Sequence, residues 1–185
     1  MVVIYESTRK KIILDPGHGG KFPGTVEGGS IEKNIVLQVS QRIRTKLVNE
    51  GALVYMTRTT DKDFGGTTAG TDINNRVAYI NNNIPASHAL VSIHVNAIGG
   101  RIGSFYQQNA TASKTFAETI QRACTPWFDV FGCYSADFAI LRDTTKASAK
   151  SLIEIGVIDD YELNAAWKQE RIASAIVDGI RNYLS

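Results

Sequence analysis

The sequence has little of what marks several special classes of protein. It contains two cysteines in 185 residues, Cys124 and Cys133, which is too few for a disulfide framework. They could form one bridge that closes a loop, or remain two reduced thiols near a turn. No apolar run reaches the roughly 18 residues that a membrane span needs. Residues 1–11 lack the apolar centre of a signal peptide. We therefore expect that the protein does not insert into a membrane. We also expect that its export or release depends on a part that is not on this chain.

The chain also lacks a strong charge of either sign. Its formal net charge is +2 at pH 7, and its Lys and Arg residues are scattered. This argues against a nucleic-acid partner but is compatible with an anionic polymer as substrate. There is no internal repeat, low-complexity tract or linker. Because 43% of the residues are apolar, we expect a single domain over residues 1–185 with its core in 11–184.

Strand and helix patterns alternate along the chain. Short apolar or β-branched runs predict strands at 11–15, 52–57, 89–95, 103–108, 138–141 and 151–155. Apolar residues at helical spacing predict helices at 31–47, 71–82, 115–124 and 162–184. Ser30 can cap the first helix, after a glycine-rich loop over 17–30. This alternation is typical of the α/β class.

Four polar residues fall where such a fold would bring them together. His18 follows the first predicted strand, His94 ends the third, and Glu154 lies towards the end of the last one. Glu32 lies in the first turn of the first helix, beside the same glycine-rich loop. Because ligands of open α/β sheets bind at the carboxyl ends of the strands, we expect one site there. His88 begins a strand away from this edge, and we interpret it as a non-ligand.

The residue types indicate a zinc hydrolase. His18, Glu32 and His94 supply the three ligands of a catalytic zinc site, which leaves a fourth position for water. Glu154 is then free to act as a general base. Its apolar neighbours suggest partial desolvation, which would raise its pKa.

Each of these residues alone also has a structural explanation. His18 could shape a turn, Glu32 could be a capping or solvated charge, and His94 could be a satisfied core histidine. Glu154 could belong to a buried salt bridge, because a buried unpaired carboxylate is costly. The four together favour the hydrolase.

Short motifs around these residues form a recognisable set. They are DPGHGG at 15–20, GSIEKN at 29–34, TRT at 57–59 followed by Asp61, NRVA at 75–78, SIHVNA at 92–97, LR at 141–142, LIEIG at 152–156 and GIRNY at 179–183. In this order they resemble the zinc-dependent N-acetylmuramoyl-L-alanine amidases of the Amidase_3 family, from about residue 11 to residue 184.

The resemblance implies a twisted, six-stranded, mostly parallel sheet flanked by helices. It implies one Zn²⁺ held by His18, Glu32 and His94, with Glu154 as the catalytic residue. The implied reaction is cleavage of the amide between the lactyl group of N-acetylmuramic acid and L-alanine in peptidoglycan. We therefore expect a monomer that acts at the bacterial cell wall, as part of a phage endolysin or an autolysin.

The sequence departs from the family pattern around the site. The catalytic strand continues as GVIDD at 156–160, where family members usually have Gly-Phe and a Ser-Asn pair, and Tyr79 replaces a common Asn. No long inserted helix is visible, which predicts an open groove. Three alternatives remain: another zinc amidohydrolase or peptidase acting on wall peptides, a non-catalytic wall-binding domain, and a phosphate binder. A phosphate binder is disfavoured, because the glycines of the loop at 17–30 lack the spacing of a phosphate-binding motif.

Overall fold

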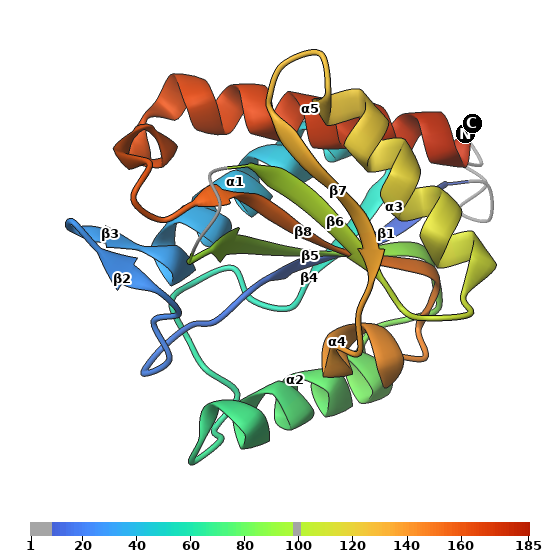
Figure 1. Ribbon diagram of the computed structural model, residues 1–185. Coiled ribbons are helices and arrows are strands. Elements are labelled where there is room, and N and C mark those ends of the chain that lie inside the picture. Colours follow the sequence, from blue (N-terminus) through green and yellow to red (C-terminus); the bar gives the residue numbers. More distant parts are fainter. Residues whose placement is uncertain (1–8, 98–100) are drawn as a thin grey trace, which may run out of the picture.

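The computed structural model describes residues 9–97 and 101–185, and a six-stranded sheet forms its centre (Figure 1). The strands are β1 (Lys11–Pro16), β4 (Leu53–Met56), β5 (Ser87–Asn96), β6 (Ile102–Tyr106), β7 (Val130–Ser135) and β8 (Ala147–Val157), in the spatial order β4-β1-β5-β8-β6-β7. Neighbouring strands are parallel except for β6 and β8. The predicted six-stranded, mostly parallel sheet is confirmed.

Helices cover both faces of the sheet (Figure 1). Helices α1 (Glu32–Asn49), α3 (Thr111–Cys124) and α5 (Ala166–Leu184) lie on one face, and α2 (Ala69–Asn83) and the short α4 (Ala139–Arg142) lie on the other. A 3-10 helix, η2 (Tyr161–Asn164), precedes α5, and β2 (Val26–Glu27) pairs with β3 (Ser30–Ile31) in a separate hairpin. The α/β class is therefore confirmed.

The apolar spacing of the helices explains their packing. The predicted stripe of α1 is buried on the sheet at Ile35, Val36, Val39, Ile43 and Leu47. Buried residues of α5 join it in the larger of two cores, between the sheet and helices α1, α3 and α5. A smaller core lies under α2 and α4. Burying one apolar face in this way stabilises each helix far more than its intrinsic propensity does.

Two local predictions are wrong. Residues 138–141, predicted as a strand, fall mainly in α4, and the sixth strand is instead β7. The apolar run is only four residues long, so period alone does not separate strand from helix. Ser30 does not cap α1: it lies in β3, the N-cap residue is Ile31, and no side chain caps the helix.

Alternation along the strands decides which face carries the candidate site. Ile93 and Ile153 belong to the core under α1 and α5, whereas Leu152 belongs to the core under α2 and α4. Because successive side chains of a strand point to opposite faces, His94 and Glu154 share the face of α2 and α4. Both residues lie near the carboxyl ends of their strands, β5 and β8.

Candidate metal centre and the neighbouring carboxylate

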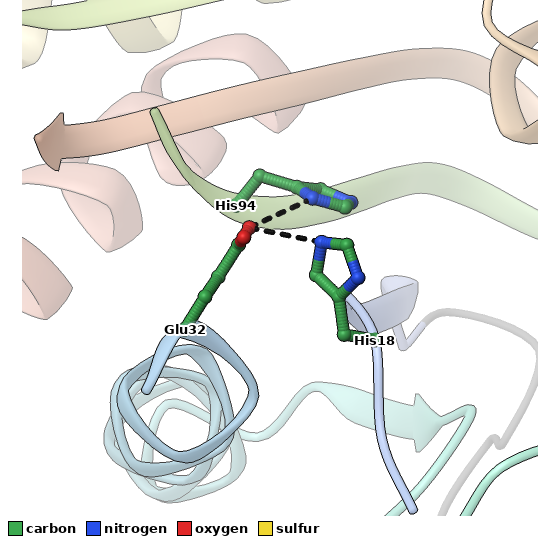
Figure 2. Close-up of side chains that lie close together, drawn as sticks. All are labelled: His18, Glu32 and His94. Atoms are coloured by element: carbon green, nitrogen blue, oxygen red, sulfur yellow. Dashed lines mark hydrogen bonds and ion pairs between the residues drawn. The ribbon is translucent and has the colours of Figure 1, made fainter. Parts of the chain in front are cut away.

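Three of the four predicted residues converge on one point (Figure 2). Oε1 of Glu32 lies 3.1 Å from Nε2 of His18 and 3.2 Å from Nδ1 of His94. All three donor atoms are within 4.8 Å of one another. They come from the loop after β1, the first residue of α1 and the end of β5. Two imidazoles and a carboxylate in this arrangement could hold a metal ion.

Backbone groups fix the carboxylate of Glu32 between the two rings. The amide of Val95 donates to Oε1 at 3.0 Å, and the amide of Thr25 donates to Oε2 at 2.9 Å. Burial would raise the pKa of Glu32, but hydrogen bonds with His18 and His94 outweigh it and hold the pKa below its usual range. The N-terminus of α1 also favours negative charge. Glu32 is therefore an oriented anion.

The glycine-rich loop closes tightly around these groups. A Cβ atom on Gly17 would lie 2.4 Å from the ring of His94. A Cβ atom on Gly24, whose φ is +71°, would lie 2.4 Å from Oε2 of Glu32 and 2.7 Å from Cδ2 of His18. Only glycine leaves room for the ring and the carboxylate at these two positions. The loop is therefore part of the centre and not merely a connection.

His18 itself has a strained backbone. Its φ is 57°, in the left-handed region that residues with a Cβ atom rarely adopt. Such a conformation costs on the order of 1–3 kcal/mol and persists where surrounding contacts impose it. Arg76 supplies one such contact, because its guanidinium donates to the carbonyl of His18.

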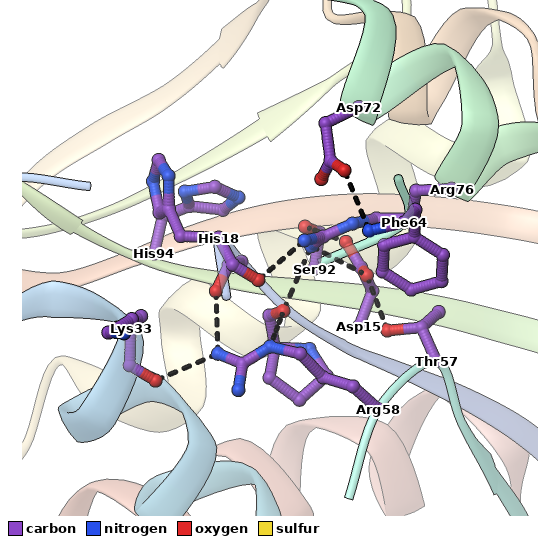
Figure 3. Close-up of polar contacts among 12 residues, drawn as sticks. Asp15, His18, Lys33, Thr57, Arg58, Phe64, Asp72, Arg76, Ser92 and His94 are labelled. Carbon is purple, nitrogen blue, oxygen red and sulfur yellow. Dashed lines mark hydrogen bonds and ion pairs between the residues drawn. The ribbon is translucent and has the colours of Figure 1, made fainter. Parts of the chain in front are cut away.

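A buried polar network holds the segment that leads to His18 (Figure 3). Oδ1 of Asp15 accepts from the hydroxyl of Thr57 at 2.7 Å and from Arg76 at 3.2 Å, and Oδ2 accepts from Ser92 at 2.7 Å. Burial would raise the pKa of Asp15, but the charge of Arg76 and the two hydroxyl hydrogen bonds lower it overall. The carboxylate and the guanidinium thus form a paired, hydrogen-bonded unit in the interior.

Two arginines, Arg58 and Arg76, also bind the backbone carbonyls that lead to His18. Arg76 donates to the carbonyl of Pro16 at 2.9 Å, and Arg58 donates to Pro16 at 3.1 Å and to Gly17 at 2.8 Å. We did not predict this role for Asp15, Arg58 or Arg76 from the sequence. Their positions inside the motifs at 15–20, 57–59 and 75–78 were the available signal.

Glu154 lies next to the centre without joining it. It pairs in register with His94 of β5 on one side and with Gly103 of β6 on the other. Its Oε2 is buried and has no hydrogen-bond partner among the described residues. Burial, and then the charge of Glu32, raise the pKa of Glu154 to about 8. This agrees with the expected desolvation and leaves a carboxyl group with an unused oxygen beside the three convergent residues.

The other sequence candidates lie elsewhere. His88 is at the opposite end of β5, where its Nδ1 accepts from the amide of Lys11 at 3.0 Å. It is outside the convergent group, as expected for a non-ligand. Cys124 and Cys133 are free thiols, so the bridge that their spacing allowed is absent.

Comparison with known proteins decides the family. The profile of the N-acetylmuramoyl-L-alanine amidase family, Amidase_3, matches residues 12–182. The chain belongs to this family. Membership confirms the enzyme class predicted from the sequence, an N-acetylmuramoyl-L-alanine amidase.

Individual amidases are similar over most of the chain. The germination-specific N-acetylmuramoyl-L-alanine amidase of Bacillus subtilis is 32% identical over 95% of this chain and 80% of its own length. The probable cell wall amidase LytH of Staphylococcus epidermidis is 30% identical over 95% of this chain, which spans 59% of that protein.

Solved amidase structures share the fold. The CwlD amidase of Clostridioides difficile, solved in complex with the GerS lipoprotein, has a TM-score of 0.85 and 29% identity. It covers 95% of this chain, which covers 98% of it. A second amidase, from Clostridium difficile 630, has a TM-score of 0.83 and 27% identity, with 95% of this chain and 97% of that chain covered.

Proposed function

We propose that the chain is a zinc-dependent hydrolase that cleaves the amide between the lactyl group of N-acetylmuramic acid and L-alanine in peptidoglycan. One observation carries the proposal: His18, Glu32 and His94 converge on one point beside the buried, unpaired oxygen of Glu154. The family of the chain supports the choice of bond.

The donor set fits zinc. Tetrahedral ligands about 2.0 Å from an ion lie about 3.3 Å apart. The two distances from Glu32 to the rings of His18 and His94, 3.1 and 3.2 Å, are close to that value. We propose these three residues as the ligands of one Zn²⁺. When bound, zinc would supply a Lewis acid that polarises the scissile carbonyl and makes a water molecule more acidic.

Glu154 then has the proton-transfer role. Its unpaired oxygen can take a proton from the attacking water, and the same carboxyl can return that proton to the leaving nitrogen of L-alanine. This assignment rests on its place opposite His94 and on the absence of another partner for Oε2 among the described residues. Asp15, Arg58 and Arg76 act indirectly, by holding the backbone that positions His18.

The proposed metal centre is partly open to solvent. The side chains of His18 and His94 are 30% and 20% exposed, so the described residues do not seal it. This supports the open groove that we expected. No helix among the described residues is long and apolar enough to cross a membrane.

We further propose that the chain is a single catalytic domain, with its core in residues 11–184, that acts as a monomer at the bacterial cell wall. Curated relatives named as germination-specific and cell wall amidases support this place of action. That the chain is part of a phage endolysin or an autolysin stays a prediction.

The decisive experiment combines zinc analysis with mass spectrometry of digested peptidoglycan. We expect one zinc per chain and new L-alanine N-termini. Other new termini would instead support a peptidase acting on wall peptides. Binding to the wall without cleavage would support a non-catalytic domain.

A further inference from the structure

A β-bulge places an aromatic ring beside Glu154. Along the pairing of β6 with β7, Ile102 lies opposite Val130 but Gly103 lies opposite Gly132, so Phe131 is the extra residue. Bulges bend a strand and re-aim a side chain, and they are frequent next to active sites. A Cβ atom on Gly103 would lie 1.9 Å from the ring of Phe131, so this ring occupies the space over Gly103.

The register connects this ring to the proposed catalytic residue. Gly103 pairs with Glu154 of β8 and carries no side chain to separate the two. Phe105, two residues further along β6, packs with the core under α2 and α4, so Gly103 shares the face of that core with Glu154. Phe131 therefore lies next to Glu154, on the sheet face that carries the site.

Further rings extend this surface towards the edge of the sheet. Tyr134 is nearly parallel to Phe131, with centroids 6.0 Å apart and planes 11° apart. Phe105 lies 5.8 Å from Phe131 and 5.5 Å from Phe138. We call Phe105, Phe131, Tyr134 and Phe138 the aromatic shelf.

The aromatic shelf is partly exposed although its residues are large and apolar: Phe105 and Phe131 are half-buried, and the other two are exposed. Tyr134 is 52% exposed and Phe138 is 38% exposed. Strand β7 is the edge of the sheet, and α3 packs against β6 and β7 from the face of α1 and α5 (Figure 1). A contiguous apolar surface of this kind commonly marks a binding site. Its continuity with Glu154 indicates that the occupant belongs to the substrate.

We propose that the aromatic shelf binds a pyranose ring of the glycan strand next to the sugar whose lactyl amide is cut. The proposal rests on the proposed function. A sugar ring presents C–H groups on its faces, and these are attracted to the electron-rich face of an aromatic ring.

The polar groups around the shelf favour a neutral sugar over the charged stem peptide. The hydroxyl of Tyr134, the one polar group of the four side chains, donates to the carbonyl of Phe131 at 3.0 Å. The charges that flank Phe138 are already paired, because Arg142 lies 3.0 Å from Asp137. The shelf therefore offers flat, uncharged surface.

Binding of a peptide-free tetrasaccharide of alternating N-acetylglucosamine and N-acetylmuramic acid tests the proposal, because this probe has no amide to cleave. Calorimetric titration of the zinc-loaded protein should show binding that Tyr134→Ala weakens about tenfold, since aromatic contacts contribute roughly this much. Tyr134→Phe removes only the hydroxyl and should bind like the parent chain. Trp127→Ala is the matched control, because Trp127 is 57% exposed and lies outside the shelf.

Two results would overturn the proposal: equal tetrasaccharide affinity in the parent chain and Tyr134→Ala, or a tenfold loss for a free stem peptide with none for the tetrasaccharide. If Tyr134→Ala loses thermal stability, Phe138→Ala replaces it and should weaken binding in the same way. The proposed function fails separately. Tetrasaccharide binding that depends on Tyr134, without release of alanine N-termini by the parent chain, would leave the shelf in place and refute the amidase mechanism.

Discussion

Glu154 and His94 face each other across the pairing of β8 with β5. A carboxyl group with one buried, unpaired oxygen thus lies opposite a candidate metal ligand in the sheet. Their separation is set by the spacing of two hydrogen-bonded strands and not by flexible loops. This gives the proton-transfer group and the metal centre a fixed relative position, as catalysis by orientation requires.

Glu154→Gln should separate chemistry from metal binding. The amide keeps the shape of the side chain but cannot take a proton, so activity on peptidoglycan should fall about a hundredfold to ten thousandfold. Zinc content should stay at one per chain, because Glu154 lies outside the three proposed ligands. Undiminished release of alanine N-termini would remove Glu154 from the mechanism.

His94→Ala should abolish zinc binding, which elemental analysis and thermal unfolding can measure. A ligand that binds only the folded state stabilises it, by about 2.7 kcal/mol at one hundred times its Kd. Added zinc should therefore raise the Tm of the parent chain but not that of His94→Ala. His88→Ala is the control, since His88 contacts the backbone of Lys11 and should leave zinc binding intact. A zinc-dependent Tm in His94→Ala would contradict the assignment.

Gly24→Ala and Gly28→Ala should have different effects on the metal centre. Both glycines have positive φ, +71° and +56°, so either substitution should cost about 1–2 kcal/mol of backbone strain. A Cβ atom on Gly24 would also meet Glu32 and His18, whereas one on Gly28 has nothing within 4 Å. Zinc titrations should show weaker binding in Gly24→Ala alone. Equal zinc affinity in the two variants would show that the loop is not part of the centre.

Arg76→Met should destabilise the fold strongly, by about 3–5 kcal/mol in urea unfolding at pH 7, because it leaves the buried Asp15 unpaired. Glu118→Gln, which breaks the exposed 3.8 Å pair with Lys114, should cost at most about 1 kcal/mol. A similar loss in both variants would argue against a special role for the buried pair.

Asp15 should also make stability depend on pH. Its folded pKa lies below the ordinary value of 3.8, so the folded state favours the ionised form. This contribution is fully present above the pKa of the unfolded chain and is lost as pH falls through the folded pKa. Urea unfolding from pH 5 down to pH 2 should show that loss in the parent chain, and Asp15→Asn should flatten the curve. An unchanged curve would contradict the assignment.

Sequence reasoning located the site because its residues follow or end recognisable strands. The apolar runs before His18 and around His94 fixed the positions of these residues along the chain, and the rule for open sheets supplied the common edge. Neither could reveal that Thr57 and Arg76 both bind Asp15, because these contacts join segments far apart in the chain.

Strand β7 was missed for a different physical reason. The bulge at Phe131 breaks the alternation that identifies a strand, and Gly132 adds a position without a side chain. The aromatic shelf could not be read from the sequence either, since it depends on a ring crossing from one strand to a glycine of the next.

Because β6 runs antiparallel to β8, the edge of the sheet that carries the site contains both strand ends and strand starts. Strands β1, β4, β5 and β8 end there, whereas β6 and β7 begin there. The proposed ligands and base come with the first group or with α1, and the bulge comes with the second. Segments that enter β6 and β7 can therefore change in length or composition while the metal-binding half keeps its geometry. The antiparallel pairing of β6 with β8 therefore separates the residues proposed for the chemistry from the strands that carry most of the aromatic shelf.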